Sequence, residues 1–182
     1  MSNQPRVVKV LAALLASMTA GAVILMALGH HPPAAGPWSL WNSLRLDAVS
    51  EAIGRDIPQA FDRWNRIEVC YSDTSAGNVE SLATVAGFAS PKEINCHFVL
   101  CNGRGGGDGE ILPTESWLRQ WSIVPGRGWF GNGKTIRICV VADGKTTQPT
   151  NFQMRKIEAL VKELSERFSI DEPVLYPRNW HQ

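Results

Sequence analysis

The longest apolar stretch of the chain lies near its start. Residues 10–28 form an uncharged run whose only hydroxyl-bearing members are Ser17 and Thr19. A helix of this length, rising about 1.5 Å per residue, spans roughly 28 Å, which is close to the hydrocarbon thickness of a bilayer. The pattern therefore predicts a single membrane-spanning helix over residues 10–28.

Two cations precede this run and set its expected orientation. Arg6 and Lys9 lie in residues 1–9, and positive residues beside a spanning helix favour the cytoplasmic side. Residues 1–9 are thus predicted to be cytoplasmic, and the rest of the chain exoplasmic or periplasmic. The alternative is a signal peptide cleaved near Gly29, where small residues flank Leu28. Both alternatives deliver the remainder of the chain out of the cytoplasm.

A Pro-rich segment separates this run from the part of the chain that can form a core. Residues 29–45 contain "HHPPAAGP" and predict a short spacer, and residues 46–182 are long enough for one domain. Between residues 47 and 61, apolar residues recur every four positions, interrupted by Gly54 and Pro58. This spacing predicts one or two short helices before the domain proper.

The next segments alternate between strand and helix patterns. In residues 66–71, "RIEVCY", Ile67 and Val69 alternate with Glu68 and Cys70, which is typical of a half-buried strand. Further strands are predicted over residues 96–101, 110–112 and 135–141, the last one apolar on both faces and therefore central, and helices over residues 78–88 and from Thr150 onward. Thr150 and Gln153 form a capping-box pattern at the start of that last helix. The order predicts an α/β domain.

The charge balance of the chain and one loop pattern indicate which classes of ligand to expect. The chain carries 18 Lys and Arg against 17 Asp and Glu, so it lacks the basic surplus that drives nucleic-acid binding. Residues Gly128 to Thr135, "GWFGNGKT", satisfy the pattern of a nucleotide-binding phosphate loop. However, Lys134 and Thr135 lead into a predicted strand, whereas the phosphate loop must open a helix. We expect neither nucleic acid nor nucleotide as a ligand.

From about Trp64 onward, the order of segments resembles the zinc-dependent N-acetylmuramoyl-L-alanine amidases and peptidoglycan recognition proteins. The resemblance is carried by "IEVCYSDT", "CHFVLCNG", "GDGEI", "WLRQ", "TIRICVVADG" and "QPTNFQ", which cover nearly two thirds of the chain. It implies a mixed central β-sheet flanked by helices. In that family three protein ligands hold a zinc ion whose bound water attacks the lactyl amide.

The resemblance places other residues where the family has its zinc ligands. Cys70 aligns with the first histidine, Pro177 aligns with the second, and the chain ends at Gln182 before a third. Cys96 aligns with the tyrosine that assists the chemistry. We therefore expect no zinc, no other cofactor and no hydrolysis. The alternatives are an active amidase with other ligands, or a zinc site rebuilt from Cys70, Cys96 and His97, although His97 also suits a satisfied strand position.

The resemblance also implies a disulfide and a ligand groove. Cys70 and Cys96 would face one another across the family's site and could form a disulfide outside the cytoplasm, whereas Cys101 and Cys139 are expected to be buried. Aromatic residues before the central strand could stack on sugar or peptide, or could simply cover the sheet. The groove candidates are Cys70, Tyr71, Asn95, Cys96, His97, Trp129 and Phe130.

These expectations give one function and two alternatives. The first is a membrane-anchored domain that recognises peptidoglycan or muropeptides without hydrolysing them. The second is an active zinc N-acetylmuramoyl-L-alanine amidase. The third is a protein-interaction module of the cell envelope, with a cell-wall protein as its partner.

Overall fold

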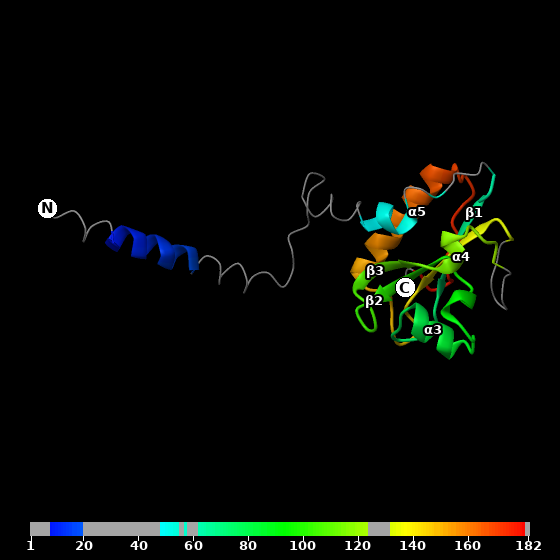
Figure 1. The fold of residues 1–182 in the computed structure, drawn as a ribbon, viewed down its shortest axis with the longest axis horizontal. Helices are drawn as coiled ribbons and strands as arrows, with labels where there is room; N and C mark the ends of the chain where they lie inside the picture. The colour runs from blue at the N-terminus through cyan, green and yellow to red at the C-terminus, as the bar shows by residue number, and fades with distance from the viewer. Residues whose placement is uncertain (1–7, 20–47, 55–56, 58–61, 124–131, 181–182) are drawn as a thin grey trace. The chain divides into compact units, whose positions relative to one another are not determined.

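A computed structural model describes residues 8–19, 48–54, 57, 62–123 and 132–180 of the chain (Figure 1). The chain divides into two compact units, Met1–Asn42 and Ser43–Gln182. The second unit contains the whole sheet, and the predicted site residues that the structure describes all lie in it.

The second unit is built on a four-stranded sheet with the order β1-β4-β2-β3. Strand β1 (Arg66–Tyr71) runs parallel to β4 (Thr135–Val140), which runs parallel to β2 (Phe98–Asn102). Strand β3 (Asp108–Pro113) returns antiparallel to β2. The sheet is therefore mixed, and the predicted α/β class is confirmed.

Strand β4 owes its central place to its composition. All six of its residues are buried, because neighbouring strands flank it and helices cover both faces. The sequence-based prediction of a central strand here is confirmed, and so are the bounds predicted for β1. Strand β2 starts at Phe98, two residues later than predicted, although the His97 N–H still bonds to the Arg137 carbonyl at 2.8 Å.

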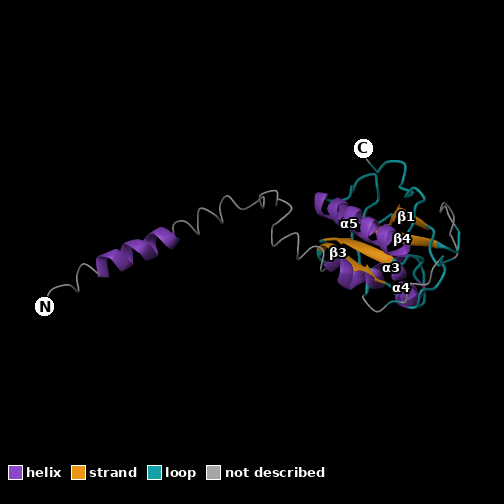
Figure 2. Ribbon diagram, turned by 90° about the horizontal axis from the view of Figure 1, so that it is seen from above, coloured by secondary structure: helices purple, strands orange, loops and turns teal. Residues whose placement is uncertain are grey.

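Helices α3 (Val79–Val85) and α5 (Asn151–Phe168) lie on opposite sides of the sheet (Figures 1 and 2). The predicted capping box of α5 is present: the Thr150 hydroxyl accepts from the Gln153 N–H, and the Gln153 side chain accepts from the Thr150 N–H. Short helices at residues 48–53, at α4 (Glu115–Leu118) and at η1 (Pro91–Glu93) complete the unit.

The face under α5 carries the main hydrophobic core. The indole of Trp117 is fully buried there, its ring centroid 4.5 Å from that of Phe98, and its Nε1 donates to the Ile53 carbonyl at 3.0 Å. This hydrogen bond ties helix 48–53 to α4. Buried aliphatic residues from the sheet and α5 fill the rest: Ile67, Val69, Leu100, Ile136, Ile138, Val140, Ile157, Leu160 and Leu164.

A short C-terminal segment covers the outer edge of β1. The Val69 N–H donates to the Leu175 carbonyl at 2.8 Å, and the Leu175 N–H donates to the Ile67 carbonyl at 3.0 Å. Edge strands otherwise leave a row of unpaired backbone groups. The end of the chain therefore protects the first strand of the sheet.

In the first unit the structure describes one helix, at residues 8–19. None of the helices in the described part of the chain combines the length and the apolar character that a membrane crossing requires. Residues 20–28 of the predicted spanning segment, and the predicted spacer 29–45, lie outside the described residues.

Candidate functional site

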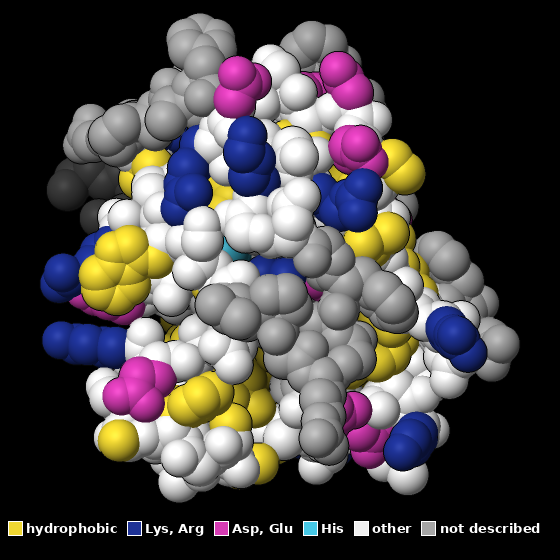
Figure 3. All heavy atoms as spheres, turned by 90° about the vertical axis from the view of Figure 1, so that its right-hand side faces the viewer, with side chains coloured by type: hydrophobic (Ala, Val, Ile, Leu, Met, Phe, Trp, Pro, Cys, Tyr) yellow, Lys and Arg dark blue, Asp and Glu magenta, His cyan; other side chains and the backbone are white. Residues whose placement is uncertain are grey.

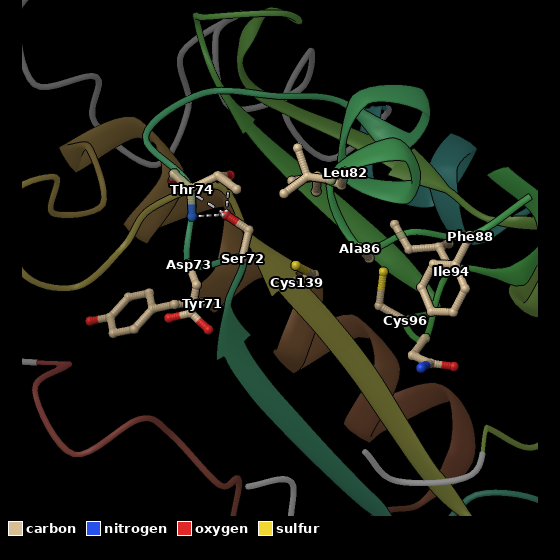
Figure 4. A pocket seen from close by; sticks show the side chains of 12 residues that line it. Tyr71, Ser72, Asp73, Thr74, Leu82, Ala86, Phe88, Ile94, Cys96 and Cys139 are labelled. Carbon is tan, nitrogen blue, oxygen red and sulfur yellow. Dashed lines mark hydrogen bonds between the residues drawn. The ribbon is translucent and has the colours of Figure 1, made fainter. Parts of the chain in front are cut away.

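A cavity of about 240 Å³ opens at the carboxyl end of β1, on the face of the sheet opposite to α5 (Figure 4). The loop after β1, helix α3 and the segment before β2 enclose it. The lining residues are Tyr71, Ser72, Asp73, Thr74, Leu82, Val85, Ala86, Phe88, Ile94, Asn95, Cys96 and Cys139.

The loop after β1 forms a polar rim on one side of this cavity. The Ser72 hydroxyl lies 2.8 Å from the Thr74 hydroxyl and also accepts from the backbone N–H groups of Thr74 and Ala142, each at 3.3 Å. Asp73 between them adopts a left-handed backbone conformation with φ of 56°, which is uncommon for a residue other than glycine. The hydrogen bonds of Ser72 hold this turn and keep its polar groups at the mouth of the cavity.

Helix α3 supplies the apolar wall. Its Asn78 cap accepts from the Ser81 N–H at 3.0 Å, and the Ser81 hydroxyl accepts from the Asn78 N–H at 2.8 Å, so the helix start is fixed. Leu82 then points toward the sheet, and Phe88 and Ile94 follow from the segment after the helix (Figure 4). The cavity thus pairs an apolar wall with a polar rim, as small-molecule sites commonly do.

Three cysteines lie together at this cavity: Cys96 and Cys139 belong to its lining, and Cys70 packs beside them. Cys139 on β4 is the register partner of Cys70 on β1, and it shares one apolar cluster with both Cys70 and Cys96. Hydrogen bonding from the Cys70 and Cys96 thiols holds the pKa of Cys139 well below its usual range, against the opposing effect of burial. The hydrogen bond to Cys139, followed by burial, raises the pKa of Cys70 and of Cys96.

The disulfide expected between Cys70 and Cys96 is not formed in this structure, where all four cysteines are free thiols. The reason is the strand order: β4 lies between β1 and β2, so Cys139 comes between the two predicted partners. Cys101 and Cys139 are buried, as the sequence predicted. What the sequence did not predict is that Cys139 belongs to the same cluster as Cys70 and Cys96.

His97 lies in the core and is not among the residues that line the cavity. Its side chain is fully buried, with Nδ1 accepting from the Arg137 N–H at 2.9 Å and Nε2 donating to the Trp121 carbonyl at 3.0 Å. Burial lowers its pKa from 6.5 to about 4. His97 is therefore a neutral, satisfied strand-end residue, which was the alternative open at the level of sequence.

Glu68 and Arg137 form a buried ion pair on the same face as the cysteines. The Arg137 Nε lies 3.1 Å from the Glu68 carboxylate, and both side chains are almost inaccessible to solvent. Glu68 and Arg137 are direct register partners. They lie two positions before Cys70 on β1 and Cys139 on β4. Arg137 also donates to the Ile123 carbonyl at 2.9 Å.

The structure brings together three of the seven predicted groove residues. Tyr71, Asn95 and Cys96 line the cavity, Cys70 lies opposite Cys139 but outside the lining, and Trp129 and Phe130 lie outside the described residues. The groove residues predicted from the sequence did not include the apolar wall that α3 and the following segment supply. Leu82, Phe88 and Ile94 carry no chemical signal of their own, so their role depended on the packing of α3.

Other candidate sites in the described part of the chain have weaker support as functional sites. A hollow of about 610 Å³ beside β3 is bordered by the acidic residues Glu51, Asp108 and Glu110 and contains none of the predicted site residues. Within the described ranges, no group of three or more His, Cys, Asp or Glu side chains is arranged to hold a metal ion. Lys134 is exposed and leads into β4 rather than into a helix, so the described end of the phosphate-loop pattern lacks the helix that phosphate binding requires.

The fold and cavity define an α/β domain with a small, partly apolar site at one edge of a mixed sheet. Comparisons with models of known protein families and with the sequences of curated proteins find no match for this chain. On the face drawn in Figure 3, acidic and basic side chains are interspersed rather than gathered by sign.

Proposed function

We propose that residues 46–182 form an amidase-like domain that binds muropeptides without hydrolysing them. The observation that carries this proposal is the position of the cavity. It lies between the loop after β1 and the segment before β2, where the resemblance to the amidases implies that the ligand binds. Tyr71, Asn95 and Cys96 were groove candidates on that basis and are among its lining residues.

The size of the cavity limits what it can hold. At about 240 Å³ it is smaller than the roughly 300 to 1,000 Å³ of typical small-molecule pockets. One residue-sized apolar group fits this volume, and a whole muropeptide does not. The lactyl-alanine part of the ligand, which carries two methyl groups, would lie against Leu82 and Ile94, with the rest of the muropeptide across the polar rim.

The proposed lack of hydrolysis rests on the residues at the implied ligand positions. Pro177 has no donor atom in its side chain, and the thiol of Cys70 is engaged with Cys139 and with the Ile138 carbonyl. His97, the remaining candidate for a rebuilt site, is fully buried and uses both ring nitrogens in backbone hydrogen bonds. Pro177, Cys70 and His97 therefore do not supply the ligands of a tetrahedral zinc site.

The proposed membrane anchor draws support from the helix at residues 8–19. Apart from Lys9, its polar side chains are those of Ser17 and Thr19, whose hydroxyls donate to carbonyls of the preceding turn at 2.9 and 3.0 Å. Both hydroxyls are thus satisfied without water, as a lipid environment requires. The anchor stays a prediction, and it would hold the domain on the exoplasmic side.

Calorimetric titration of the full-length chain with N-acetylmuramoyl-L-alanyl-D-isoglutamine tests binding. Val85 lines the cavity and is 72% exposed, so Val85→Asp should weaken binding at least about tenfold without unfolding the domain. Leu118→Asp, at a position 57% exposed and away from the cavity, is the matched control and should leave binding unchanged. Equal affinity in all three proteins, or no heat at millimolar ligand, contradicts the proposal.

A second measurement separates binding from hydrolysis. The purified chain is incubated with cell-wall sacculi, and released stem peptide and bound zinc are both quantified. We expect neither peptide release nor stoichiometric zinc. Peptide release accompanied by one zinc per chain would show an active amidase instead.

A further inference from the structure

Cys139 and Cys96 in the cavity lining form a cluster with the adjacent Cys70, and this cluster has a defined centre. Cys139 lies on β4, between Cys70 on β1 and Cys96 just before β2. A central thiol can accept S–H hydrogen bonds from both neighbours, whereas each outer thiol has only the central one as its thiol partner. A thiolate is the nucleophilic form of cysteine and is stabilised by such donors. The central position therefore favours Cys139 as the reactive sulfur of the three.

The cavity gives reagents access to this cluster from one side. Cys96 and Cys139 line the cavity, and Figure 4 shows both sulfur atoms directed into it. Cys70 is not among the lining residues. Cys101, the fourth thiol, is fully buried in the same apolar cluster, where burial raises its pKa to about 11. The cavity therefore presents Cys96 and Cys139 to an entering reagent, whereas the partly exposed Cys70 and the buried Cys101 lie outside its lining.

Backbone geometry favours the same two thiols as a bonded pair. Cys70 and Cys139 are direct partners on neighbouring strands, which lie about 4.8 Å apart, and their parallel Cα–Cβ bonds keep the Cβ atoms at a similar distance. A disulfide needs Cβ atoms about 3.8 Å apart. Cys96 lies outside the strands, between η1 and β2, so direct strand pairing does not set its separation from Cys139.

We propose that the cavity is a thiol–disulfide exchange site, in which Cys139 attacks an incoming small-molecule disulfide and Cys96 resolves it into a Cys96–Cys139 disulfide. The Cys139 thiolate bonds to one sulfur of the reagent, whose S–S bond breaks, and one thiolate leaves with the electron pair. Cys96 then loses its proton and attacks the Cys139 sulfur, which displaces the second thiolate. Two cysteines are oxidised by two electrons, and the reagent is reduced to two thiols.

Exchange with oxidised glutathione, followed by alkylation and tryptic mass spectrometry, tests the pairing. Trypsin places Cys70 in peptide 67–92, Cys96 with Cys101 in 93–104, and Cys139 in 138–145. The full-length chain should lose two of its four thiols and yield peptide 93–104 linked to 138–145. Cys101→Ala, the control, removes the second cysteine of that peptide and should give the same linked product.

Two further results decide whether Cys139 is the attacking thiol. In the unaltered chain under native conditions, iodoacetamide should modify Cys139 at least about tenfold faster than Cys101. Cys70→Ala should still form the Cys96–Cys139 disulfide, but more slowly, because one of the two S–H donors to Cys139 is lost. A Cys70–Cys139 or Cys70–Cys96 link, four free thiols after exchange, or faster labelling of Cys101 would each overturn the proposal.

Discussion

The face of the sheet under α5 buries large aromatic and aliphatic side chains, whereas the face under α3 carries thiols, an ion pair and a cavity. Both faces come from the same strands, and alternate residues of β1 and β4 supply each of them. The first face has Trp117 and Phe98 in direct contact. The second has Cys70 opposite Cys139 and Glu68 opposite Arg137. One face is built for stability and the other leaves room for chemistry.

The largest effect is expected from truncating the centre of the first face. Trp117→Ala should lower the free energy of unfolding by about 5 kcal/mol, because it removes a fully buried indole and leaves the Ile53 carbonyl without its Nε1 donor. Leu82→Ala on the second face should cost only about 2 kcal/mol, since its side chain already borders a cavity. Urea unfolding measures both, and equal losses would erase the contrast between the faces.

The next effect concerns the ion pair of the second face. Glu68→Gln should destabilise the fold by about 3 to 4 kcal/mol, because the Arg137 charge stays buried without its carboxylate. The matched control is Glu172→Gln, which removes the same charge from the exposed pair with Arg66 and should cost less than about 1 kcal/mol. If both variants lose the same stability in urea, burial of the pair is energetically unimportant.

A pH-dependent effect is expected from His97. Its pKa falls from 6.5 to about 4 on folding, so the unfolded chain takes up this proton first as the pH drops. The stability contribution is therefore complete above about pH 6.5 and declines by about 3 kcal/mol as the pH falls toward 4. His97→Asn, whose amide oxygen can replace Nδ1 as acceptor, should flatten the slope between these values. An unchanged slope of unfolding free energy against pH would contradict this account.

The smallest effect belongs to the solvent-facing side of α5. Lys162 lies 3.8 Å from Glu166, and both side chains are mostly exposed. Lys162→Ala should change the unfolding free energy by less than about 0.5 kcal/mol. If urea unfolding shows that Lys162→Ala loses more than about 1 kcal/mol of unfolding free energy, this surface of α5 contributes to stability and the prediction is wrong.

Local signals predicted the strands and helices, because the information lies within each segment. The apolar run of β4 and the Thr150 and Gln153 cap of α5 each needed only a few neighbouring residues. The cavity and the thiol cluster depended on strand order instead. The sequence alone did not show that Cys139 would lie between Cys70 and Cys96. The role of His97 likewise required partners at positions 121 and 137, and the pairing of Leu175 with β1 required a segment that lacks any strand pattern.

The C-terminal bridge to β1 has a consequence for how the domain is made. Glu68 and Leu175 are neighbours in the sheet, although 107 positions separate them along the chain. During synthesis, β1 emerges well before Leu175, so its outer edge keeps its backbone groups unpaired while the intervening residues are added. Any delay before Leu175 is added, or loss of the segment around it, would leave the nascent sheet open to pairing with another chain.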